Sequence, residues 1–165
     1  MRGKNILVLV VSFLVAGAVL AQAGEAKAKA APKAAASKAV IWPAADLKWA
    51  DMTPGPPGVK VVDLWGDHTK GAFGAMIKFP AGTSVGLHTH THDARIVIVS
   101  GTLIHGSDGK PEARLGAGSY LMQPGGNYRH TTACDKASDC IFFIESGAAF
   151  DLIMADESKK DAPKK

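Results

Sequence analysis

Glycine and proline residues divide most of this chain into short apolar segments, and this division limits the possible folds more than any other feature. The chain has 165 residues, among them 18 glycines and 9 prolines. Turn residues at these intervals interrupt regular structure after a few residues, and no convincing long helix is left. The pattern predicts an all-β barrel or sandwich. Strands are expected at 59–65, 72–79, 96–100, 102–105, 119–123, 128–132, 141–145 and 150–154.

The first 23 residues have the three parts of a secretory signal peptide. Arg2 and Lys4 supply a positive start, an apolar run follows, and small residues ending at Ala23 form a cleavage site. An uncleaved membrane anchor is the alternative, but the apolar run is short for a membrane span. We therefore expect residues 1–23 to be removed and the mature protein to be periplasmic or secreted.

The remaining chain divides by composition into a tether, a domain and a tail. Residues 24–39 are rich in alanine and lysine and lack an apolar face, so they are expected to form a flexible tether. Residues 155–165 are charged and are expected to be a disordered tail. Residues 40–154 contain the apolar segments and are expected to form one folded domain.

The distribution of charge excludes some partners. The chain has a net charge of +4, but residues 40–154 carry 9 Lys and Arg against 11 Asp and Glu. A nucleic-acid partner is not expected, because its binding face would need positive charge on the folded part. No stretch after the signal peptide is long and apolar enough for a membrane span, so the cleaved protein is not expected to be an integral membrane protein.

Three of the six histidines lie close together in the sequence, at His88, His90 and His92. Because side chains on a regular strand alternate between two faces, these three would leave the same face. Parallel imidazoles on one face are typical of a site for a divalent transition metal. The alternative is a set of polar residues on a solvent-facing strand.

The glycines around these histidines form a pattern that returns later in the chain around another histidine. The two motifs are Gly82-x5-His88-x-His90-x3-Ala94-x6-Gly101 and Gly118-x5-Pro124-x-Gly126-x3-His130. In this order they resemble the two motifs of the cupin superfamily, which implies a double-stranded β-helix, or jelly-roll barrel. The flanks at 71–82, 115–126 and 150–152 resemble a family of single-domain bacterial cupins of uncharacterised function, similar to DUF4437.

This resemblance implies a metal held by His88, His90 and His130, with Fe²⁺ or Zn²⁺ favoured and Cu²⁺, Ni²⁺ or Mn²⁺ also compatible. The glutamate that completes many cupin sites falls on Ala94 here, and the adjacent Asp93 would face the other way on a regular strand. Three neutral ligands leave the charge of the ion uncompensated, which makes it a stronger Lewis acid. Some cupins with three histidines and no glutamate cleave diketones with dioxygen at iron(II), so a dioxygenase-like reaction is compatible.

A pocket beside this metal would bind a small organic molecule, the expected partner. His92 is expected to line the pocket instead of binding the metal. Further residues are expected to line the pocket because they share a strand face with the motif positions: Ala94, Ile96, Tyr128 and Thr132. Glu145 is a candidate general base only if its strand face points inward. The alternatives to an enzyme are a non-enzymatic small-ligand binding or sensing module, with or without zinc, and a structural cupin that is stabilised by a disulfide and by homodimerisation.

Two connections carry further expectations. Gly101 between two apolar runs predicts a tight hairpin. Cys134 and Cys140, the only cysteines, flank a polar loop and would face each other across a second hairpin. In an exported protein a disulfide between them is favoured, with free thiols as the alternative.

Arg95 and Arg129 are expected to form ion pairs in the scaffold, and His105 is expected to be a core or rim histidine.

Overall fold

The computed structural model describes residues 38–155, and residues 40–155 belong to one compact unit. The expected signal peptide, nearly all of the expected tether and the expected tail lie outside the described residues. In chain order the elements are the 3-10 helix η1 (Ala44–Asp46) and the strands β1 (Ala50–Asp51), β2 (Lys60–Gly66), β3 (Phe73–Phe79), β4 (Ser84–Thr89), β5 (Ala94–Ser100), β6 (Thr102–Ser107), β7 (Ala113–Gly116), β8 (Tyr120–Gln123), β9 (His130–Cys134), β10 (Cys140–Ser146) and β11 (Ile153–Met154).

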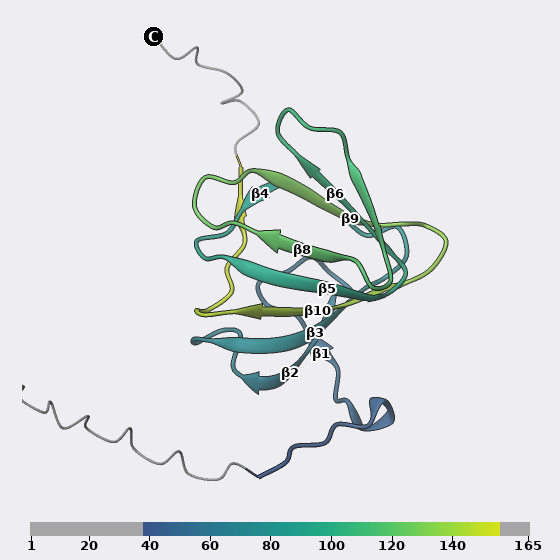
Figure 1. Ribbon diagram of the computed structural model, residues 1–165, viewed down its shortest axis with the longest axis vertical. Helices are drawn as coiled ribbons and strands as arrows, with labels where there is room; N and C mark the ends of the chain where they lie inside the picture. Colours follow the sequence, from purple (N-terminus) through teal and green to yellow (C-terminus); the bar gives the residue numbers. More distant parts are fainter. Residues whose placement is uncertain (1–37, 156–165) are drawn as a thin grey trace, which may run out of the picture. The chain divides into compact units, whose positions relative to one another are not determined.

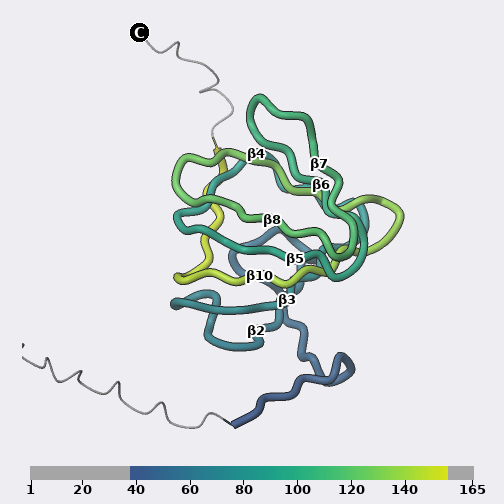
Figure 2. The backbone as a smooth tube through the Cα atoms, viewed as in Figure 1, coloured from purple at the N-terminus to yellow at the C-terminus, as the bar shows by residue number. Residues whose placement is uncertain are grey.

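These strands form two antiparallel sheets, which confirms the prediction of an all-β jelly roll (Figure 1). One sheet has the order β1-β2-β3-β10-β5-β8, and the other has the order β11-β4-β9-β6-β7. β11 runs beside β4, so the C-terminal segment returns to the strand that carries the first histidine motif (Figure 2). Among residues 38–155, we find no helix with the length and apolar character needed to cross a membrane.

The core lies between the two sheets because each strand buries alternate side chains. On β3 the side chains of Phe73, Ala75, Ile77 and Phe79 are buried. The residues between them are less buried, with the exception of Gly74. β5 and β10 follow the same period, and Leu103 of β6 joins the same cluster from the opposite sheet. This two-residue period fixes the register, since a shift by one residue would expose every buried side chain.

The prediction of a hairpin at Gly101 was wrong. β5 and β6 lie in different sheets, so the chain passes from one sheet to the other at this residue. Gly101 has a φ of 75°, and a Cβ atom there would overlap the backbone at Asp139. A glycine with positive φ is equally suited to a hairpin and to a barrel corner, so the sequence signal did not distinguish them.

The disulfide between Cys134 and Cys140 is present, with its Cα atoms 5.7 Å apart. The expected hairpin between the two cysteines is again a connection between sheets, because Cys134 ends β9 and Cys140 begins β10. Both side chains are buried. The disulfide therefore joins the two sheets at one end of the core.

Removing this disulfide is expected to lower the free energy of unfolding. For the Cys134→Ser, Cys140→Ser double variant we expect a loss of about 2 kcal/mol, because the bond closes a short loop in the unfolded chain. Urea unfolding of the oxidised wild type and the double variant measures the difference. Dithiothreitol should lower the stability of the wild type and leave the variant unchanged; equal stability of the two proteins would contradict the prediction.

Candidate metal centre

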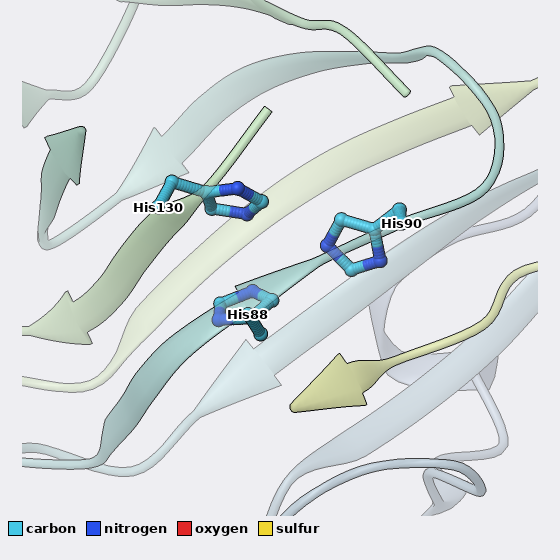
Figure 3. Close-up of side chains that lie close together, drawn as sticks. All are labelled: His88, His90 and His130. Carbon is cyan, nitrogen blue, oxygen red and sulfur yellow. The ribbon is translucent and has the colours of Figure 1, made fainter. Parts of the chain in front are cut away.

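The fold brings His88, His90 and His130 together on the core side of the smaller sheet (Figure 3). His88 on β4 and His130 on β9 are cross-strand partners, and their ring centroids are 4.1 Å apart. The ring of His90 lies 5.1 Å from that of His88 and 5.2 Å from that of His130. One nitrogen from each residue lies within 4.8 Å of the other two, which is close enough for one metal ion to contact all three.

His92 does not join this group because the chain bends at Thr91 and His92, and the side chain of His92 is exposed. His90 still joins the group, although β4 ends one residue before it, at Thr89. Asp151 holds the bend: its carboxylate accepts hydrogen bonds from the backbone N–H and the hydroxyl of Thr91. The same-face argument for three histidines therefore fails at the bend between His90 and His92.

Backbone carbonyls fix the orientation of all three imidazoles. Nδ1 of His88 donates to the carbonyl of Gly86 at 2.7 Å, and Nδ1 of His130 donates to the carbonyl of Tyr128 at 3.1 Å. Nδ1 of His90 donates to the carbonyl of Asp151. Because a carbonyl only accepts hydrogen bonds, each neutral ring carries its proton on Nδ1 and has a lone pair on Nε2. This is the arrangement of metal-binding histidines whose tautomer is set by an outer hydrogen bond.

Burial keeps these rings neutral. Burial, with smaller contributions from the nearby imidazoles, lowers the pKa of His130 to about 3 and that of His88 to about 4; burial also lowers the pKa of His90. His130 is 0% exposed, and its Nε2 has no hydrogen-bond partner within the described part of the chain. A buried nitrogen without a partner is unfavourable, and a metal ion would supply that partner. The residues present therefore fit a divalent transition metal.

A cavity of about 50 Å³ lies beside the histidines, and its walls are mainly apolar. Ile96 and Thr132 line it, as the shared strand faces predict, together with His88 and His90. The remaining lining residues are Met52, Pro54, Gly55, Pro56, Ile77, Phe79, Val85, Leu103, Gln123, Phe142, Ile144, Phe150 and Leu152. A site of this kind suits a small ligand with a largely apolar body.

Tyr128 lies behind His130 and is not among the residues that line this cavity. Its ring stacks on the ring of His130, with centroids 5.3 Å apart, and its hydroxyl is 2.9 Å from Nε2 of His105. His105 is buried, as expected of a core histidine. Tyr128 precedes β9, so the face argument that grouped it with Thr132 does not hold at this position. The rings of His105 and Tyr128 therefore both pack near the ring of His130, with centroids 5.2 and 5.3 Å from it.

Among the described residues, no carboxylate joins the three histidines as a possible ligand, although Oδ1 of Asp151 lies 4.0 Å from Nδ1 of His90. Ala94 is buried and, with His92, lines a smaller second cavity. Asp93 is exposed and accepts a hydrogen bond from the backbone N–H of Gly125. Glu145 lies on the outer face of its sheet, where it pairs with Arg95 at 3.8 Å. The condition for Glu145 as a base is therefore not met, and the expected ion pair of Arg95 is confirmed.

Arg129 also forms its expected ion pair, with Asp108 at 3.4 Å. A second group of possible metal ligands is a weaker candidate for a metal site. It consists of Asp63, Asp67 and His68. The ammonium of Lys70 lies 2.6 Å from the carboxylate of Asp67, and hydrogen bonds from Lys70 and Thr69 lower the pKa of Asp67. Lys70 therefore already pairs with one of the two carboxylates of this second group.

Sequence reasoning missed the contribution of the C-terminal segment. Phe150 and Leu152 line the cavity, and Asp151 holds both His90 and Thr91. Asp151 is 61 residues from His90, so no local pattern indicated the contact. Gln123 was also missed, although its place on β8, where alternate residues face the core, indicated an inward side chain.

Residues 37–149 match the model of the ChrR cupin-like domain family. The chain belongs to this family. No curated protein matches. The narrower resemblance of this cupin-like domain to DUF4437-type cupins stays a prediction.

Solved structures share the fold of this family member. The polyketide cyclase RemF from Streptomyces resistomycificus matches with a TM-score of 0.61 and 17% identity, over 75% of this chain and 89% of that one. An RmlC-like cupin from Ralstonia eutropha matches with a TM-score of 0.55 and 23% identity, over 74% and 76%. KdgF from Halomonas sp. matches with a TM-score of 0.52 and 20% identity, over 66% and 94%. At these identities the likeness establishes the cupin fold.

Proposed function

We propose that this cupin binds a divalent transition metal through Nε2 of His88, His90 and His130 and acts on a small organic molecule in the adjoining cavity. The observation that supports this most is the set of three Nε2 lone pairs beside an apolar cavity. Fe²⁺ or Zn²⁺ suits three imidazoles, and Cu²⁺, Ni²⁺ and Mn²⁺ are also compatible.

We propose a dioxygenase-like reaction as the activity. Bound metal would supply Lewis-acid or redox chemistry at the three imidazoles. The apolar walls exclude water from the reacting end of the ligand, and the backbone carbonyls of Gly86, Tyr128 and Asp151 hold the rings in place. Among the described residues no carboxylate lines the cavity, so chemistry that requires a carboxylate base is disfavoured.

The same lack of a carboxylate supports a second candidate, a non-enzymatic module that binds or senses a small ligand. We place either activity outside the cytoplasm. Two observations support this location: the signal-peptide pattern in residues 1–23 and the disulfide between Cys134 and Cys140, a bond typical of oxidising compartments.

Metal analysis combined with oxygen-electrode measurements tests the proposal. Protein purified without added metal is expected to carry metal at near one ion per chain. Protein reloaded with Fe²⁺ is expected to consume dioxygen in the presence of a small ketone or carboxylic acid and not in its absence. Bound metal without turnover on a broad panel would favour the binding module. Metal content at the level of an EDTA-treated sample would contradict the metal centre and the dioxygenase-like reaction, and would leave only a binding module without metal.

A further inference from the structure

We propose that the carboxamide of Gln123 selects the ligand of this cavity, by a hydrogen bond to an uncharged oxygen group on a small, largely apolar molecule. This inference rests on the ligand-binding part of the proposed function and does not depend on the metal. It concerns a residue of β8, outside both the histidine group and the segment that holds it.

The position of Gln123 directs its side chain into the cavity. Gln123 is 4% exposed and lines the cavity together with His88 and His90. Its cross-strand partner on β5 is Ala94. Directly opposed residues have Cβ atoms about 5 Å apart on the same face, so the small side chain of Ala94 leaves space beside the amide.

No hydrogen bond within the described residues gives the side-chain amide of Gln123 a structural role. Among residues 38–155 no hydrogen bond to its side chain is found, and its amide atoms are not among the fully enclosed side-chain atoms that lack a partner, so they keep open space beside them, which the cavity provides. Buried amides are almost always hydrogen-bonded, because leaving one without a partner is unfavourable. A buried glutamine at the wall of an apolar cavity therefore indicates a partner that enters the cavity.

The charge of the lining residues limits what that partner is. Among the described residues, none that lines the cavity is a lysine, arginine, aspartate or glutamate. A charged group on the ligand next to Gln123 would lose its hydration without gaining a counter-charge. A carbonyl or hydroxyl oxygen would gain a hydrogen bond from the amide without that loss. The cavity thus favours neutral ketones, alcohols and related molecules over anions at this end.

Three probes of the same shape test this inference: 2-butanone, propanoate and 2-methyl-1-butene. Their binding to zinc-loaded and to EDTA-treated protein is measured by NMR titration of methyl resonances. In the EDTA-treated wild type, where no metal charge attracts propanoate, we expect 2-butanone to bind most tightly. In Gln123→Met we expect the affinity for 2-butanone to fall about 5- to 10-fold, the usual range for one neutral hydrogen bond, and that for 2-methyl-1-butene to hold or rise.

Two further measurements separate ligand selection from a structural role. Gln123→Met is expected to keep or raise the melting temperature, because it replaces an unpartnered buried amide with an apolar side chain of similar size. Met122→Gln, on the outer face of the same strand, is the matched control and should change neither affinity. A lower melting temperature of Gln123→Met, or weaker zinc binding with unchanged 2-butanone affinity, would overturn the inference. If the protein fails to bind zinc, but the EDTA-treated protein still shows the expected order of affinities for the three probes, only the metal centre is contradicted.

Discussion

Replacing His130 with alanine is expected to weaken Zn²⁺ binding by at least about 100-fold. Each of the three Nε2 atoms supplies one ligand, and losing a ligand costs more than losing an outer hydrogen bond, which alone weakens binding about 10- to 100-fold. His130 is the most buried of the three, and its Nε2 is fully enclosed without a hydrogen-bond partner among the described residues. Competition with a fluorescent zinc chelator at pH 7.5 measures the change.

His92→Ala is the matched control, because His92 lies in the same sequence motif but its side chain is exposed. It should bind Zn²⁺ as tightly as the wild type. His88→Ala serves as a second ligand variant, and near-ultraviolet circular dichroism checks that each variant is folded. If folded His130→Ala and wild type have the same affinity for Zn²⁺, these three histidines are not the metal site.

Lowering the pH from 6.5 to 5 is expected to destabilise the metal-free protein steeply. Burial lowers the pKa of four histidines, His88, His90, His105 and His130. In the unfolded chain they regain the ordinary pKa of 6.5. Below that pH the unfolded chain binds more protons than the folded protein, so the free energy of unfolding falls as the pH falls. Each histidine contributes up to about 1.4 kcal/mol per pH unit.

Urea unfolding in EDTA at intervals between pH 7.5 and 5 measures this slope. Aspartate and glutamate stay ionised over most of this window, so the histidines dominate it. His130→Phe should flatten the slope, because it removes one of the four groups whose pKa burial lowers. A free energy of unfolding that is constant or rises as the pH falls from 6.5 would contradict the assignment of neutral buried imidazoles.

The sequence predicted the strands better than the connections between them. Alternating burial along β3 and β5 follows from the residues themselves, because one face must be apolar. The corners at Gly101 and between Cys134 and Cys140 were misread as hairpins. Whether two consecutive strands pair with each other or lie in opposite sheets depends on how the whole chain closes, which a local turn signal does not contain. β7 was missed because its four residues lie in a polar stretch.

The candidate site shows the same limit. The glycine-framed motifs indicated His88, His90 and His130, which the fold brings together. They did not indicate that β4 ends before His90 or that Asp151 orients that ring. These features depend on contacts between residues far apart in sequence, and they decide the tautomers of the imidazoles and the shape of the cavity.

The hydrogen bond from His90 to Asp151 has a consequence for the order in which the protein matures. The three histidines all precede residue 131, yet the ring of His90 is oriented by a carbonyl 61 residues further along the chain. A nascent chain that already contains every histidine still lacks this partner. On the proposed function, tight metal binding would therefore follow the docking of β11 on β4, and a bound metal would mark a chain that has finished folding.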